Sequence, residues 1–191
     1  YSKDVANLKA FWAKRGFKPV FKSVTDDEAF LAQGDLVVSE NSPTVKEILD
    51  FMMLWSDNLL ADRLAGLAAR AAGYPLNIKG IDTIFRTLLA QFEIDDSKLV
   101  VADASGLSKK NKITAKLMGE LLYKIRKDER YALLYESLPV GGVSGTLQNR
   151  FTTTAPSAVG LVRAKTGTLN GTATLAGYVQ STDREYVFVT L

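Results

Sequence analysis

The sequence predicts an α+β protein in which a helical middle is followed by antiparallel strands. Apolar residues recur at helical spacing between residues 43 and 127, whereas short strand-type runs dominate from residue 161 onward. The 191 residues are 47% hydrophobic and 24% charged, so the chain is long enough to bury a substantial core.

Helical periodicity covers five segments, at residues 3–15, 43–55, 59–72, 77–94 and 114–127. Ser42 is the expected N-cap of the second segment, with Pro43 at its first helical position. Gly73 and Pro75 end the third segment, because neither residue continues a helix well.

Strands are expected at residues 20–24, 36–38, 99–101, 161–168, 174–180 and 186–191. The turn at 182–184 joins the last two strands as an antiparallel pair. Segment 103–108 has the composition of a loop, and a glycine-rich stretch at 141–145 separates the last helix from the strands.

The composition excludes several kinds of chemistry. The chain has no His and no Cys, which removes Ser-His-Asp and Cys-His triads, disulfides, iron–sulfur clusters and His- or Cys-based metal sites. The base of an enzyme must then be Lys, Glu, Asp or Tyr, and we expect no metal and no cofactor. A net charge of +3 without long basic runs predicts no nucleic-acid partner, and no apolar run is long enough for a transmembrane segment.

The two ends predict a piece of a longer protein. The chain opens on Tyr1 without a Met or a signal peptide, and it stops at Leu191 inside a strand pattern. We therefore expect a chain that is truncated at both ends.

Two tripeptides could carry chemistry, Ser56-Asp57-Asn58 between two helices and Lys165-Thr166-Gly167 on a late strand. In this order they are typical of β-lactamases and penicillin-binding proteins, where an S-x-x-K element accompanies them. Alternatively, the first tripeptide only caps a helix, and the second is a solvated strand residue followed by a bulge glycine.

The chemistry of such a site suits a chain without His. Ser56 would relay protons near the leaving group, and Asn58 would fix a substrate amide. Lys165 would supply positive charge to the hydroxyl network and to an anionic substrate carboxylate.

The three residues that follow Lys165 would bind the substrate. The Thr166 hydroxyl would donate to the substrate carboxylate. Gly167 has no side chain, so a substrate could lie against the strand edge there. Thr168 would offer its backbone N–H as an oxyanion-hole donor.

Four longer stretches carry a family resemblance, at residues 42–62, 103–111, 137–147 and 164–178. Among them are Asp103-Ala104-Ser105-Gly106-Leu107-Ser108 and Gly145-Thr146-Leu147. Over about residues 39–191 the chain resembles the class C low-molecular-mass penicillin-binding proteins, the D-alanyl-D-alanine carboxypeptidase/endopeptidase family. This resemblance implies a penicillin-recognition (β-lactamase/transpeptidase-like) fold, with an antiparallel sheet packed with a helical lobe, incomplete in this chain.

The resemblance also implies a domain organisation and a function. Residues 39–191 would be the C-terminal part of the transpeptidase-like domain, and residues 1–38 would belong to the same domain after upstream inserted domains. The protein would be an extracytoplasmic serine DD-peptidase of peptidoglycan metabolism. Its partners would be stem peptides ending in D-Ala-D-Ala and β-lactam antibiotics.

One element of the family pattern is missing. No Ser in this chain has a Lys three positions later, so the expected S-x-x-K nucleophile would lie upstream of Tyr1. Ser105 and Ser108 are poor substitutes, because a Ser-Gly-Leu-Ser loop needs only turn-forming hydroxyls. Two further alternatives remain open: a β-lactamase of the same fold, and a non-catalytic module that binds wall peptides or a partner protein.

Overall fold

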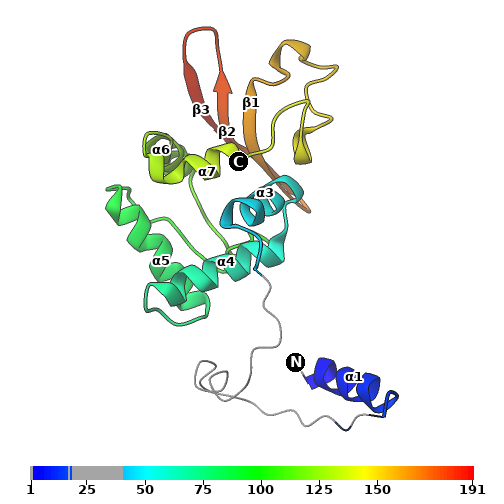
Figure 1. The fold of residues 1–191 in the computed structure, drawn as a ribbon. Coiled ribbons are helices and arrows are strands. Elements are labelled where there is room, and N and C mark those ends of the chain that lie inside the picture. The colour runs from blue at the N-terminus through cyan, green and yellow to red at the C-terminus, as the bar shows by residue number, and fades with distance from the viewer. Residues whose placement is uncertain (1, 17, 19–40) are drawn as a thin grey trace. The chain divides into compact units, whose positions relative to one another are not determined.

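The computed structural model describes residues 2–16, 18 and 41–191, in two units divided between residues 42 and 43 (Figure 1). In the first unit, α1 (Ser2–Ala13) corresponds to the helix predicted at 3–15. The Arg15 guanidinium covers the Phe11 ring, 3.6 Å from its centroid. The strands predicted at 20–24 and 36–38 lie outside the described residues.

The second unit begins with α3 (Val45–Trp55), and its start differs from the prediction. Thr44 is the N-cap: its Oγ1 accepts a hydrogen bond from Glu47 N at 3.3 Å, and Glu47 Oε2 accepts one from Thr44 N at 2.8 Å. This reciprocal pair satisfies two backbone N–H groups at once. The prediction of Ser42 as N-cap and Pro43 as first helical residue was therefore wrong.

The next helices are α4 (Asn58–Ala71), α5 (Ile78–Gln91) and α6 (Ala115–Arg126), which confirm the predicted segments. Their N-caps are Asp57, Asn77 and Thr114, and each side chain accepts a backbone hydrogen bond from the first turn. The end of α5 comes three residues earlier than predicted.

Short elements that the sequence pattern did not indicate follow α6. They are η1 (Glu129–Tyr131), α7 (Ala132–Glu136), η2 (Gly145–Leu147) and η3 (Pro156–Ala158). Of these, η2 lies against both α3 and the first strand of the sheet.

The sheet of this unit has three antiparallel strands in the order β1 (Val162–Leu169), β2 (Thr172–Gln180) and β3 (Glu185–Thr190). This confirms the α+β prediction. Helix α6 packs on β2 and β3 (Figure 1), and the Tyr178 hydroxyl donates to Leu122 O at 2.8 Å. The strand predicted at 99–101 is reduced to a single bridge between Val100 and Lys112.

Two buried clusters hold this unit together. The first joins α5 to α6 through Leu89, Ile94 and Leu117. The second lies under η2, where Leu147 is fully buried against Val162 and Ala164 of β1. The second cluster fixes η2 to the strand that carries Lys165.

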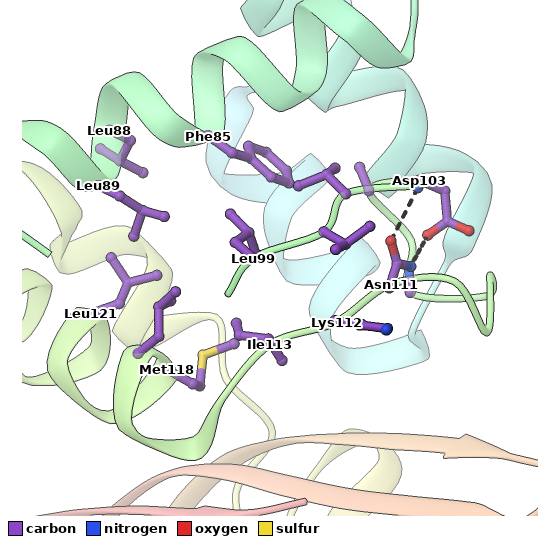
Figure 2. Close-up of a pocket in the computed structure, with 15 residues that line it drawn as sticks. Phe85, Leu88, Leu89, Leu99, Asp103, Asn111, Lys112, Ile113, Met118 and Leu121 are labelled. Atoms are coloured by element: carbon purple, nitrogen blue, oxygen red, sulfur yellow. Dashed lines mark hydrogen bonds between the residues drawn. The ribbon is translucent and has the colours of Figure 1, made fainter. Parts of the chain in front are cut away.

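An apolar cavity of about 360 Å³ opens between α5, α6 and the segments 99–104 and 111–113 (Figure 2). Figure 2 shows Phe85, Leu89 and Leu121 around it, with the hydrogen-bonded pair Asp103 and Asn111 at one end. None of the six predicted site residues lines this cavity. Within residues 2–16, 18 and 41–191, no helix has the length and apolarity to cross a membrane.

Candidate active site

The first tripeptide forms the turn between α3 and α4. Ser56 has left-handed backbone angles (φ 56°, ψ 47°), which are uncommon for a residue with a side chain and end α3 sharply. Asp57 N donates to Met52 O at 3.1 Å, and Asp57 Oδ1 accepts from Leu60 N at 2.8 Å as the N-cap of α4. The capping interpretation is thus correct for Asp57. The Asn58 side chain is exposed at the first residue of α4.

The second tripeptide reaches this turn from β1. Lys165 Nζ donates to Ser56 Oγ at 2.7 Å and to Thr166 O at 2.7 Å. Burial lowers the pKa of Lys165 below its ordinary value of 10.5. Gly167 pairs with Thr174 in continuous register, so the interpretation as a solvated lysine followed by a bulge was wrong.

The other predicted residues of β1 lie beside this contact. Thr166 Oγ1 donates to Thr146 Oγ1 of η2 at 2.9 Å. A Cβ added at Gly167 would collide with Thr174 Oγ1 on the neighbouring strand, so a larger residue there would force the Thr174 side chain to move. Thr168 is exposed near the end of the strand.

The outer edge of β1 is only partly covered. Segment 139–141 pairs with it, since Ala164 N donates to Pro139 O at 3.0 Å and Gly141 N donates to Val162 O at 2.8 Å. Alternate residues of a strand direct their N–H groups to the same edge. The N–H groups of Thr166 and Thr168 therefore point to this edge beyond the paired segment, where an extended ligand could add as a strand.

A hydrogen-bonded loop lies against α4. Asp62 Oδ1 of α4 accepts from Ala104 N and Ser105 N, both at 2.9 Å. Ser108 Oγ accepts from Lys110 N at 3.2 Å, and the buried Ser105 Oγ has no hydrogen-bond partner. In the described part of the chain, neither serine thus has a basic group bonded to its hydroxyl, and a nucleophile needs one for activation.

Comparison with models of known protein families assigns the chain to one of them. Residues 4–191 match the model of the D-Ala-D-Ala carboxypeptidase 3 (S13) family. The chain belongs to this family.

Individual S13-type relatives agree with this result. The chain is 38% identical over 180 residues to a carboxypeptidase DacB from Mycolicibacterium smegmatis, covering 92% of the chain and 38% of that protein. It is 34% identical over 160 residues to the D-alanyl-D-alanine carboxypeptidase DacB of Haemophilus influenzae, covering 81% and 33%. The chain thus spans about a third of the length of these curated relatives.

A solved structure confirms the fold. Penicillin-binding protein 4 of Haemophilus influenzae, in complex with a β-lactam, superposes with a TM-score of 0.69 at 33% identity, over 75% of this chain and 34% of that protein. The chain therefore has the penicillin-recognition fold that the resemblance implied.

The candidate site contains one residue that sequence reasoning did not select. Ser56, Lys165 and Thr166 come together as expected, and Thr146 joins them through its hydroxyl. The stretch Gly145-Thr146-Leu147 was noticed only as part of the resemblance, because a threonine on a short 3-10 turn carries no local signal of a site. In the described residues, no cluster of three His, Cys, Asp or Glu side chains could hold a metal ion.

Proposed function

We propose that this chain carries the S-D-N and K-T-G segments of a serine DD-peptidase that removes the terminal D-Ala from peptides ending in D-Ala-D-Ala. The hydrogen bond from Lys165 Nζ to Ser56 Oγ carries the proposal. It links the two tripeptides into one polar group, in which a partly buried ammonium orients a hydroxyl.

The proposed reaction uses a serine nucleophile from an S-x-x-K element, which these 191 residues do not contain. The Lys of that element takes the proton of the serine hydroxyl as Oγ attacks the carbonyl of the penultimate D-Ala, and the C–N bond to the terminal D-Ala then breaks. Ser56 passes a proton to the departing amine, and water then hydrolyses the acyl-enzyme ester. Ser56 is suited to this step because Lys165 donates to its oxygen and leaves its own proton free to transfer.

The remaining residues would hold the substrate. The Thr166 hydroxyl and the Lys165 charge would bind the terminal carboxylate, and the Asn58 amide would fix a substrate amide. The N–H of Thr168 would bind the developing oxyanion, together with the N–H of the nucleophile. Gly167 would let the peptide lie along the open edge of β1.

The domain organisation is part of the proposal. Residues 39–191 would form the C-terminal part of the transpeptidase-like domain. Residues 1–38 would belong to the same domain, and domains inserted into it would lie upstream of them in the sequence. Phe51, Trp55 and Leu59, which surround Ser56 in sequence, are 51%, 67% and 66% exposed. Exposed apolar residues of this kind support the proposal that a neighbouring segment covers them, and we propose that this segment is the S-x-x-K element.

The proposed partners are peptidoglycan stem peptides and β-lactams, and the proposed location is extracytoplasmic, where peptidoglycan lies. The β-lactam complex of the Haemophilus influenzae protein supports this proposal.

The test uses a longer protein that contains this chain together with an S-x-x-K element. We expect a fluorescent penicillin to label it covalently on a denaturing gel, and a peptide ending in D-Ala-D-Ala to release D-Ala. The 191-residue chain alone serves as the matched control and should remain unlabelled. Covalent label on this isolated chain would contradict the proposed origin of the nucleophile.

Other outcomes identify the alternatives. Rapid hydrolysis of nitrocefin without D-Ala release would favour a β-lactamase. Reversible peptide binding without label or hydrolysis would favour a non-catalytic module.

A further inference from the structure

The hydroxyls of Thr166 and Thr146 form a pair at the edge of the site. Thr166 Oγ1 donates to Thr146 Oγ1 at 2.9 Å, although the two residues are 20 positions apart. Thr146 is exposed, so its side chain is accessible to solvent beside β1.

The position of Thr146 is fixed on both sides by its neighbours. Leu147 is fully buried against Val162 and Ala164 of β1. Gly145 has a φ of +55°, and a Cβ added there would lie 2.8 Å from Leu54 O, near the end of α3. The short turn η2 therefore packs between β1, which carries Lys165, and α3, which is followed by Ser56. This packing fixes the position of Thr146.

Counting the donors shows what this pair can do. Lys165 already directs two of its three N–H groups to Ser56 Oγ and Thr166 O. Each of the two threonine hydroxyls has one proton, and one of these protons is used within the pair. The second proton can be donated to a ligand. An anionic ligand would form the strongest hydrogen bond with it, because hydrogen bonds to charged groups are stronger than neutral ones.

We infer that Thr146 is a positioning residue for the substrate carboxylate, an inference that rests on the proposed function. When the carboxylate binds, Thr146 donates to Thr166 Oγ1, and the Thr166 proton turns to the carboxylate. The two hydroxyls then form a chain that ends on the anion, in which each hydrogen bond polarises the next.

The experiment compares Thr146→Val, which removes the hydroxyl, with Thr146→Ser, which keeps it, in the longer protein with its S-x-x-K element. Two peptides that differ only at the terminal group serve as substrates, one with a free carboxylate and one with a carboxamide. Thr153→Val, at an exposed threonine away from the site, is the matched control.

For the carboxylate peptide we expect Thr146→Val to lower kcat/KM by on the order of tenfold, mainly through KM. The loss on the carboxamide peptide should be about two- to threefold, because the acceptor is neutral. Thr146→Ser and Thr153→Val should stay close to the wild type.

Three results overturn the inference while leaving the proposed function intact: no loss in Thr146→Val, equal losses on both peptides, or no rescue by Thr146→Ser. Equal losses would indicate a merely structural role, which circular dichroism of each variant would reveal independently. A wild-type protein that hydrolyses neither peptide and takes no penicillin label would overturn the proposed function and the inference together.

Discussion

Lys165 and Ser56 are 109 positions apart in the sequence, and their side chains meet at 2.7 Å between Nζ and Oγ. One residue lies in the middle of an edge strand and the other ends a helix in a left-handed conformation. Backbone strain of this kind is stored where the surrounding structure holds it in place, and it concentrates at functional sites. The turn after α3 thus presents Ser56 to the strand as well as connecting two helices.

Removing either partner should disable acylation. In the longer protein, we expect Ser56→Ala and Lys165→Met each to lower the rate of acylation by penicillin about 10²- to 10⁴-fold. The double variant should lose little more than one single variant, since the two residues share one hydrogen bond. Stopped-flow acylation measures all three, with Lys79→Met at an exposed lysine as the control. Fully additive losses would show that the two side chains act independently.

The lowered pKa of Lys165 predicts the alkaline limit of activity. The ammonium is the form that donates to Ser56 Oγ, so acylation should decline as the pH rises through the pKa of Lys165. Because burial places this pKa below 10.5, the decline should begin at a lower pH than for an exposed lysine. Acylation rates between about pH 7 and 11 test this. In Lys165→Arg, any activity that remains should persist to higher pH, because arginine keeps its proton.

The same shift predicts how stability varies with pH. The native state releases the Lys165 proton more readily than the unfolded chain does, so burial of the ammonium opposes folding below the lowered pKa. The free energy of unfolding of Lys165→Met should therefore exceed that of the wild type most at neutral pH. This difference should shrink as the pH rises toward 10.5. Urea unfolding of both proteins across this range measures the difference. An advantage that grows with pH would contradict the burial argument.

Local sequence signals predicted most helices of this fold because their ends are set by nearby residues. Asn77 and Thr114 were placed correctly at helix starts, where their side chains accept backbone hydrogen bonds. The error at Ser42 arose because a proline suggested the first helical position, while Thr44 and Glu47 had the stronger reciprocal pair. The strand at 99–101 failed because the Asn111 side chain takes the N–H groups of residues 102 and 103, which ends the pairing.

The site was harder to predict because its contacts are long-range. No periodicity indicates that Lys165 meets Ser56, so the pair could be expected only from the order of two short motifs. Thr146 was missed since its role depends on how Gly145 and Leu147 pack against α3 and β1. Such packing becomes visible only in the folded chain.

Asp62 should anchor the loop that follows residue 102. Its Oδ1 accepts from Ala104 N and Ser105 N, so Asp62→Ala leaves two partly buried N–H groups without this acceptor. We expect a loss of about 1–3 kcal/mol in the free energy of unfolding and faster hydrogen exchange at both amides. Asp62→Asn is the matched control, since it retains an oxygen at the same position. Equal losses in both variants would mean that charge, rather than the acceptor, anchors the loop.

Tyr178 should make the chain sensitive to alkali. It is 2% exposed, its hydroxyl donates to Leu122 O at 2.8 Å, and burial raises its pKa from 10 to about 12. The native state therefore keeps the phenol proton after the unfolded chain has lost it. The stabilisation associated with this raised pKa is fully present below pH 10 and is lost as the pH rises toward about 12.

Tyr178→Phe tests this relationship by urea unfolding of the 191-residue chain between about pH 8 and 12. Below pH 10 the variant should be less stable by about 1 kcal/mol, because the Leu122 carbonyl loses its donor. Above pH 10 the wild type should lose stability faster, so the two curves should converge and then cross. Tyr186→Phe, at a tyrosine that is 50% exposed, is the control and should keep the slope of the wild type. Parallel curves for Tyr178→Phe and the wild type across the whole range would show that the buried phenol does not set the alkaline limit, because ionisation of Tyr178 would then cost the folded chain nothing.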